Sequence, residues 1–145
     1  FEEEHMVKKV FAAFPRVAVV LNTGGMMDTL WFKDNPAVGA ALLSEEGRYY
    51  AGCNTENVSY PVGTCAETGA IAAMTAAGDR RIAEMLVLAD GNQLITPCGA
   101  CRQRIKEFAS PHTPVHLASP QGIVKTLTLE ELLPYGFNDG KLTHD

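Results

Sequence analysis

Apolar residues recur along this chain in short runs separated by polar turns, and their spacing predicts strands that alternate with helices. Two runs, Val38–Leu43 and Arg48–Asn54, flank the turn-forming sequence Ser-Glu-Glu-Gly and predict a β-hairpin. The apolar run Ile82–Ala89 predicts a buried strand. Two more short strands are expected over Thr113–Ala118 and Ile123–Leu127, around a Ser-Pro-Gln-Gly turn.

Helices are predicted between these strands. Thr64 is the expected N-cap of the first helix, because Glu67 follows at the spacing of a capping box. An Ala-rich run continues until Gly78 ends it, so this helix is expected to begin at Cys65. A second helix is expected over Cys98–Phe108, directly after a proline.

Two further helices are predicted nearer the ends of the sequence. A short one over Thr128–Leu133 follows the last strand, and apolar residues at helical spacing predict another over residues 2–14. Residues 15–35 show no clear period. The alternation of strands and helices predicts one layered α/β domain over residues 1–145, with residues 1–36 as an atypical N-terminal segment.

Composition and charge narrow the possible partners. The 145 residues include 12 Lys and Arg against 17 Asp and Glu, a net charge of −5. Because a protein that binds a phosphate chain needs the opposite sign, extended nucleic acid is not the expected ligand. The apolar run Val17–Leu21 is much too short to cross a bilayer, and Glu2, Glu3 and Glu4 do not form the positive region of a signal peptide. A cytoplasmic protein without a membrane partner is expected.

The spacing of the four cysteines carries more information than their number. Cys98 and Cys101 form a C-x-x-C pair, Cys65 lies 33 residues before Cys98, and Cys53 lies 12 residues before Cys65. In a reducing compartment such a set indicates metal binding or redox chemistry before structural disulfides. A redox pair would leave Cys65 unused, whereas three thiolates with one open position match a catalytic zinc site. Cys53 has no partner in this pattern and is expected to be a small buried strand residue.

The expected helix starts would influence these thiols. Cys65 would open one helix and Cys98 with Cys101 the other, so the sulfurs would lie near positive dipole ends that favour thiolates. Glu67, two residues after Cys65, is poorly placed as a fourth ligand but could reach a metal-bound water. Taken alone, Glu67 would be a capping-box carboxylate. With Cys65 beside it, the pattern is typical of a hydrolase in which zinc activates water and a carboxylate moves the proton.

Five short motifs follow one another between Val38 and Phe137. They are Val38-Gly39-Ala40-Ala41-Leu42, Gly52-Cys53-Asn54-Thr55-Glu56-Asn57-Val58-Ser59-Tyr60-Pro61, Cys65-Ala66-Glu67, Thr96-Pro97-Cys98-Gly99-Ala100-Cys101-Arg102-Gln103 and Leu132-Leu133-Pro134-Tyr135-Gly136-Phe137. Together they strongly resemble the motifs of the small zinc-dependent cytidine deaminase family. The resemblance implies a three-layer α/β/α sandwich with a mixed central sheet of about five strands.

The resemblance also implies the catalytic groups. Cys65, Cys98 and Cys101 would hold one Zn²⁺ per chain. Glu67 would carry protons while zinc-activated water attacks C4 of cytosine and ammonia departs. The implied enzyme is a hydrolase of cyclic amidine C–N bonds. It would convert cytidine and 2′-deoxycytidine to uridine and 2′-deoxyuridine in pyrimidine salvage.

The matching residues further outline a nucleoside site. Asn54 and Glu56 match residues that hydrogen-bond the ribose 3′-hydroxyl, where a carboxylate suits a free hydroxyl and repels a phosphate. The backbone N–H of Ala66 and the carbonyl of Thr96 match groups that contact the base edge. Phe137 matches an aromatic residue that packs over the base in a neighbouring subunit's site. Homotetramers with sites at subunit contacts are therefore implied.

Two positions depart from the family pattern. Residues 31–37 read Trp-Phe-Lys-Asp-Asn-Pro-Ala, where the family has a Pro-Tyr-Ser element and a base-stacking phenylalanine. Thr68 follows Glu67, where three-cysteine members often carry an arginine. Because three thiolates and Zn²⁺ sum to −1, we expect the two helix N-termini to offset most of this charge, with Arg102 or Arg104 as helpers.

Two other functions fit part of the sequence. The unusual N-terminal segment is compatible with deamination of a related aminopyrimidine, such as a nucleoside antibiotic of the blasticidin type. A non-catalytic, zinc-stabilised interaction domain would use the cysteines but has no need of Glu67. A nucleic-acid editor is disfavoured by the acidic balance and by Glu56, which would lie near an incoming phosphate.

Overall fold

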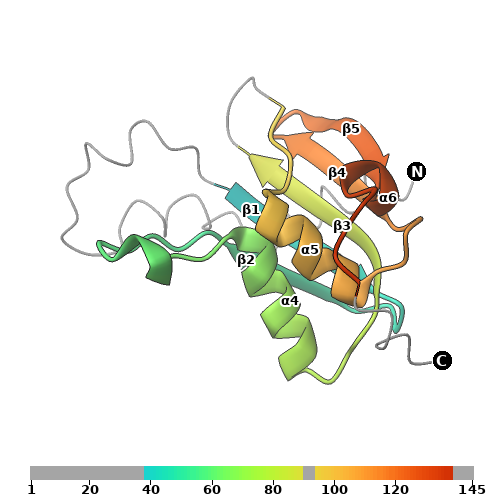
Figure 1. Cartoon of the computed structure of the whole chain (residues 1–145), viewed down its shortest axis with the longest axis horizontal. Helices are drawn as coiled ribbons and strands as arrows, with labels where there is room; N and C mark the ends of the chain where they lie inside the picture. Colours follow the sequence, from blue (N-terminus) through green and yellow to red (C-terminus); the bar gives the residue numbers. More distant parts are fainter. Residues whose placement is uncertain (1–37, 90–93, 139–145) are drawn as a thin grey trace.

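A five-stranded mixed sheet forms the centre of the molecule (Figure 1). The computed structural model describes residues 38–89 and 94–138. The strands lie side by side in the order β2-β1-β3-β4-β5. Their bounds are Val38–Ser44 for β1, Tyr49–Cys53 for β2, Ile82–Ala89 for β3, Pro114–Ser119 for β4 and Gly122–Thr128 for β5. All five predicted strands are thus confirmed within two residues at each end.

The chain connections explain the mixed sheet. β1 and β2 form the predicted antiparallel hairpin, with Leu42 opposite Tyr50 and Gly47 at a φ of 80° in the turn. β1 also pairs antiparallel with β3. β3 and β4 are parallel, which requires the crossover that helix α5 (Gly99–Phe108) provides. β4 and β5 then form a second hairpin.

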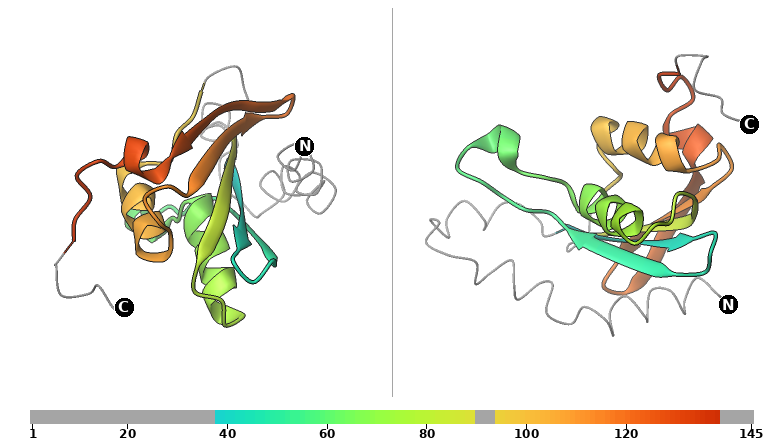
Figure 2. Two further views of the ribbon diagram at one scale, coloured as in Figure 1. Left: turned by 90° about the vertical axis from the view of Figure 1, so that its right-hand side faces the viewer. Right: turned by 90° about the horizontal axis from the view of Figure 1, so that it is seen from below.

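One face of the sheet carries the main hydrophobic core. Alternate residues of β1, β3 and β4 point to this face and meet apolar residues of α4 (Ala66–Ala76) and α5. Both helices lie on the same side of the sheet, as Figure 2 shows. Met74 of α4 and Ile105 of α5 are fully buried there. The short helix α6 (Leu129–Leu132) adds Leu129 and Leu132 to this core.

The opposite face of the sheet has a smaller apolar cluster. Ala41, Leu86 and Ala118 form its buried centre. Within residues 38–89 and 94–138, no helix covers this face. The helix expected over residues 2–14 lies outside the described residues, as do residues 15–35. No helix among the described residues has the length and apolar character needed to cross a membrane.

A glycine pair brings β2 unusually close to α4. A Cβ atom on Gly52 would overlap the backbone of Ala66 and Ala70, and a Cβ on Gly69 would lie 3.3 Å from the Gly52 Cα. Only the absence of a side chain at Gly52 permits this approach. The first turn of α4 is therefore held directly against the end of the hairpin.

Buried Asp79 fixes the other end of the same hairpin. Its carboxylate accepts hydrogen bonds from Ser44 Oγ at 2.7 Å and Tyr50 Oη at 2.8 Å, and Arg48 pairs with both of its oxygens. Asp79 follows α4 and precedes β3. Because a buried carboxylate needs such partners, this cluster joins the hairpin to the α4–β3 connection. The hairpin and α4 are thus tied together at both ends.

Candidate metal and substrate site

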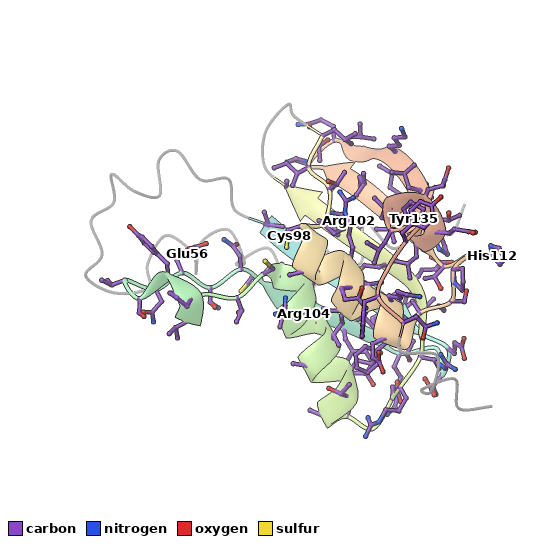
Figure 3. All side chains as sticks on the ribbon, in the orientation of Figure 1. Glu56, Cys98, Arg102, Arg104, His112 and Tyr135 are labelled. Atoms are coloured by element: carbon purple, nitrogen blue, oxygen red, sulfur yellow. The ribbon has the colours of Figure 1, made fainter. Side chains whose placement is uncertain are left out.

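Two helices begin at the same place beside the sheet, and each begins with a cysteine. Cys65 is the N-cap of α4, and Cys98 is the N-cap of α5, both with extended backbone angles. Cys101 lies in the first turn of α5 and is fully buried. Figure 3 shows Cys98 at the end of α5 that faces the arm between β2 and α4, the segment that bears Glu56. The expected helix starts are confirmed within one residue, with each N-capping cysteine just outside its helix.

The predicted capping box of α4 is wrong. Cys65, not Thr64, is the N-cap, and no side chain caps the helix. Thr64 instead forms an isolated bridge with Thr55, with backbone hydrogen bonds of 2.9 and 3.0 Å and a hydroxyl pair at 2.8 Å. This bridge closes the base of the loop between β2 and α4, so that α4 begins one residue later than predicted. Glu67 therefore lies at the second helical position, and its carboxylate does not form the capping-box hydrogen bond.

The three predicted ligand sulfurs come together. The Sγ atoms of Cys65, Cys98 and Cys101 all lie within 4.8 Å of one another, and Cys65 Sγ is 3.8 Å from Cys98 Sγ. Four ligands at about 2.3 Å from zinc in a tetrahedron lie about 3.8 Å apart. Thiolates are also the soft ligands that select zinc. The residues present therefore fit Zn²⁺, and these three sulfurs would fill three of the four positions of a tetrahedral site.

The surroundings of the three thiols shift their pKa values in different directions. Burial raises the pKa of the Cys65 thiol. Burial and the nearby Glu67 carboxylate raise the pKa of Cys101 as well. For Cys98 burial also acts upward, but hydrogen bonds from the backbone N–H of Cys101, from the thiols of Cys101 and Cys65 and from the backbone N–H of Ala100 together outweigh it and lower its pKa. The N-terminus of α5 therefore favours a thiolate at Cys98, as expected for a helix start.

A cleft of about 420 Å³ opens beside these sulfurs. Its lining includes three apolar residues, Val38, Val87 and Ile95. It also includes seven of the predicted site residues: Asn54, Glu56, Cys65, Ala66, Glu67, Thr96 and Cys98. This volume lies in the range of small-ligand sites. The structure thus brings the proposed catalytic carboxylate, two of the ligand cysteines and both sugar-side residues into one cavity. Glu67 is only 3% exposed.

The two residues that the sequence predicts to bind the sugar, Asn54 and Glu56, are hydrogen-bonded to each other. Asn54 Nδ2 donates to Glu56 Oε1 at 3.0 Å, and Asn54 Oδ1 accepts from the backbone N–H of Val38 at 3.1 Å. The Asn54 backbone N–H also donates to the Val38 carbonyl at 3.1 Å. Asn54 is therefore fixed by the edge of β1 and in turn orients the Glu56 carboxylate. One free N–H of the Asn54 amide and the second oxygen of Glu56 remain for a ligand.

Arg102 acts on this site through the loop before α5. Its guanidinium donates to Pro97 O at 2.8 Å, Thr96 Oγ1 at 2.9 Å and Leu132 O at 2.8 Å. These bonds hold the Thr96–Pro97 segment immediately before Cys98. All three guanidinium nitrogens thus bind oxygen. Within the described part of the chain, Arg102 makes no hydrogen bond to a cysteine sulfur.

Arg104 and Thr68 are not among the groups that shift the pKa values of the three thiols. Arg104 is exposed and lies two residues after Arg102, which places its side chain on a different side of α5 (Figure 3). Thr68 Oγ1 is buried and has no hydrogen-bond partner among the residues that the structure describes. The backbone N–H groups of Ala100 and Cys101, at the start of α5, do donate to the Cys98 sulfur.

Two aromatic residues of the predicted motifs lie differently with respect to the cleft. Phe137 is 76% exposed and does not line the cleft of its own chain. Tyr60, from the short 3₁₀ helix η1 (Tyr60–Val62), does line the cleft, although sequence reasoning gave it no separate role. Tyr60 stands five residues before Cys65 in a motif that the resemblance already included. Its place on the arm between β2 and α4 was the available signal.

The remaining candidate ligands lie elsewhere. Cys53 is half-buried on β2 and is not part of the sulfur cluster. His116 is buried on β4, where Nδ1 lies 2.9 Å from Thr126 Oγ1, and His112 is exposed in the loop before β4. The other two histidines, His5 and His144, fall outside the described residues. Neither His112 nor His116 joins the metal cluster, as the sequence predicted.

Comparisons with known proteins agree with this geometry. The sequence model of the cytidine and deoxycytidylate deaminase zinc-binding region matches residues 19–117. The cytidine deaminase of Sporosarcina psychrophila is 41% identical over 107 residues, which are 74% of this chain and 79% of that protein. The cytidine deaminase of Halalkalibacterium halodurans is 41% identical over 100 residues, 69% of this chain and 76% of that protein.

The fold agrees as well. The crystal structure of a cytidine deaminase from Burkholderia pseudomallei superimposes with a TM-score of 0.69 at 34% identity. The match covers 87% of this chain and 97% of that chain. The α/β cytidine deaminase-like fold and zinc as its metal are therefore confirmed. With the matched region spanning most of its length and three sulfurs set for one zinc ion, this chain belongs to the zinc-binding cytidine and deoxycytidylate deaminase family.

Proposed function

We propose that this protein is a zinc-dependent hydrolase that converts cytidine and 2′-deoxycytidine to uridine and 2′-deoxyuridine, with release of ammonia. The observation that carries this proposal is the shared cleft. Buried Glu67, Cys65, Cys98, Asn54 and Glu56 all line it, which supports a metal-assisted reaction on a ligand that also reaches Asn54 and Glu56. The names of the relatives, which are cytidine deaminases, support the same substrate.

Cys65, Cys98 and Cys101 would hold the zinc ion beside this cleft, which Cys65 and Cys98 line. Zinc bound there supplies a Lewis acid that makes water available as a nucleophile near neutral pH. Glu67 lies close enough to raise the pKa values of the Cys65 and Cys101 thiols, so its carboxylate is next to the metal position. In this role Glu67 would take a proton from water and deliver it to N3 of the cytosine ring as the C4–O bond forms. It would then take the proton of the hydroxyl group on C4 and pass it to the amino group, so that the C4–N bond breaks and ammonia leaves.

The base edge would be read by backbone groups. The Ala66 N–H lies at the first position of α4, where helix geometry leaves it without an intrahelical acceptor. The Thr96 carbonyl belongs to the segment that Arg102 holds in place. A backbone donor and a backbone acceptor in one cleft would suit the O2 and amino groups of cytosine. Val38, Val87 and Ile95 supply the apolar surface for the ring.

The sugar end favours a free nucleoside. Glu56 offers a carboxylate oxygen to a 3′-hydroxyl, and Asn54 orients that carboxylate. A 3′-phosphate at the same place would meet a like charge, which disfavours 3′-nucleotides and nucleic acid. The sugar contacts proposed for Asn54 and Glu56 are to the 3′-hydroxyl and not to the 2′ position. We therefore propose that both nucleosides are substrates.

The proposal extends to assembly and cellular setting. Phe137 is exposed and outside its own cleft, which supports a role in the site of a neighbouring copy. Exposed Val58, Tyr60 and Val62 on the arm after β2 offer a further apolar contact surface. We propose a cytoplasmic homotetramer with sites at subunit contacts, in which residues 1–145 act as one catalytic domain and serve pyrimidine salvage.

The direct test is the fall in ultraviolet absorbance when purified, zinc-loaded protein is mixed with cytidine. We expect turnover of cytidine and 2′-deoxycytidine, and stoichiometric ammonia. Cytidine 3′-monophosphate is expected to be a poor substrate, and Glu56→Gln should reduce the discrimination against it. No ammonia from either nucleoside would contradict the proposal. Turnover of a blasticidin-type nucleoside alone would indicate the related aminopyrimidine activity instead.

A further inference from the structure

The side chain of Gln103 forms a two-point contact with the backbone of Phe137. Gln103 Nε2 donates to the Phe137 carbonyl at 3.1 Å, and the Phe137 N–H donates to Gln103 Oε1 at 2.9 Å. A carboxamide that satisfies both backbone groups of one residue imitates a strand neighbour and fixes the direction of that peptide unit. The direction of the Cα–Cβ bond of Phe137 is thereby fixed as well.

Other contacts hold the segment before Phe137 against α5. Arg102 donates to the Leu132 carbonyl at 2.8 Å. A Cβ on Gly136 would lie 2.6 Å from both Leu133 Cδ2 and Lys106 Cδ, so the chain passes close to these side chains. The segment after α6 is therefore seated on α5 at several points. Gln103 is the last of these contacts before the aromatic ring.

The ring of Phe137 is not packed into the cleft of its own subunit. It is 76% exposed and does not line the cleft that contains Glu67. Two hydrogen bonds thus fix the backbone of a residue whose large apolar side chain extends into solvent. Fixing the backbone of such a residue costs conformational entropy, and a contact between the ring and another molecule would offset that cost.

We propose that Gln103 is a positioning residue that aims the Phe137 ring at the cleft of a neighbouring copy of this chain. This inference rests on the proposed function, which places the Phe137 ring over the base in that cleft. Gln103 lies two residues after Cys101 on the helix that begins with the zinc ligands. Helix α5 would thus carry two of the zinc ligands of its own site and orient an aromatic ring toward the site of a neighbouring copy.

Substitution of Gln103 should affect substrate binding more than the chemical step. Stacking of a base on an aromatic ring contributes about 1–3 kcal/mol. Gln103→Ala is therefore expected to raise the KM for cytidine by about tenfold, with a smaller change in kcat and one zinc ion per chain retained. Phe137→Ala should have a similar effect. The double variant should be no worse than Phe137→Ala, because both changes remove the same ring contact.

Two further variants test whether the rise in KM comes from loss of the Gln103–Phe137 contact or from a general loss of folded structure. Gln121→Ala removes an exposed glutamine from the β4–β5 turn and should leave KM unchanged. Gln103→Glu keeps the acceptor for the Phe137 N–H but loses the donor to its carbonyl, so it tests the contact if Gln103→Ala folds poorly. It should raise KM at an unchanged zinc content. Equal KM values for wild type, Gln103→Ala and Gln103→Glu would overturn the inference.

Mixed assemblies provide the decisive readout. Subunits with Gln103→Ala and subunits with Glu67→Gln are coexpressed with different tags and purified together. Active sites then come only from the Gln103→Ala subunits, but their neighbours carry an intact Gln103–Phe137 contact. A kinetic component with the wild-type KM is expected. A KM that stays at the Gln103→Ala value would place the effect within one subunit and refute the inference. An inactive wild-type protein would instead refute the proposed function itself.

Discussion

The Sγ atoms of Cys65 and Cys98 lie 3.8 Å apart, although the two residues are separated by 33 positions and cap different helices. This separation matches two corners of a tetrahedron around zinc. The close approach of β2 to α4 and the Arg102 contacts to the segment before α5 hold the two helix starts in place. The ligand set is therefore largely formed by the fold itself.

Removal of one ligand sulfur should release the metal. Cys65→Ala and Cys98→Ala are each expected to lower the zinc content well below one ion per chain, because two thiolates hold zinc far less tightly than three. Cys53→Ala is the matched control, since Cys53 lies outside the cluster, and it should retain zinc. Elemental mass spectrometry of the purified variants measures this. Loss of zinc from Cys53→Ala would contradict the assignment.

Zinc-free protein should react with iodoacetamide first at Cys98. The pKa of Cys98 is lowered, while burial raises the pKa values of Cys65 and Cys101. Because the thiolate is the nucleophile and Cys98 is also exposed, its modification should be fastest near neutral pH. Peptide mass spectrometry over a time course identifies the order. Fastest labelling at buried Cys101 would be inconsistent with this electrostatic picture.

Zinc affinity should rise with pH. In the metal-free protein the raised pKa values of Cys65 and Cys101 keep both thiols protonated at neutral pH. Zinc must displace these protons, so each step toward higher pH reduces the cost of binding. Competition with a chelator at pH 6, 7 and 8, corrected for the chelator's own protonation, gives the slope. A pH-independent affinity would show that the thiols are already ionised.

Arg102→Lys should impair the protein although it keeps the positive charge. Lysine cannot reach three acceptors at once, so the oxygens of Thr96, Pro97 and Leu132 lose partners. Each buried acceptor left unpaired costs about 1–3 kcal/mol. We expect a lower melting temperature and a reduced kcat/KM, whereas exposed Arg104→Lys should match wild type. If Arg102→Lys were fully active, charge alone would be the role of Arg102.

Gly52→Ala should disrupt the packing that brings the α4 start to the cleft. Its Cβ would overlap the backbone of Ala66 and Ala70, which cannot yield as a flexible side chain can. Overpacking of this kind costs about 1–3 kcal/mol, and a backbone clash tends to the upper end. Gly39→Ala on neighbouring β1 is the control, because nothing lies within 4 Å of its Cβ. Thermal unfolding and zinc content should separate the two variants, and equal stability would refute the packing argument.

Sequence patterns predicted the local structure well where apolar runs and turn residues dominate. The hairpin from Val38, the strand from Ile82 and the helix starts at the cysteines follow from such patterns. The Thr64 cap failed because its bridge to Thr55 depends on a loop closing upon itself, which no local spacing reveals. The Gly52–Gly69 approach and the three acceptors of Arg102 are likewise contacts between distant segments.

The most direct test of the account compares Glu67→Gln with Glu107→Gln. Both replace a glutamate by its isosteric amide, but Glu67 is buried in the cleft and Glu107 is exposed on α5. Glu67→Gln should bind one zinc ion per chain and lose cytidine turnover by about 10³-fold, because it can no longer transfer protons. Glu107→Gln should keep both. Undiminished turnover by zinc-loaded Glu67→Gln would contradict the central claim.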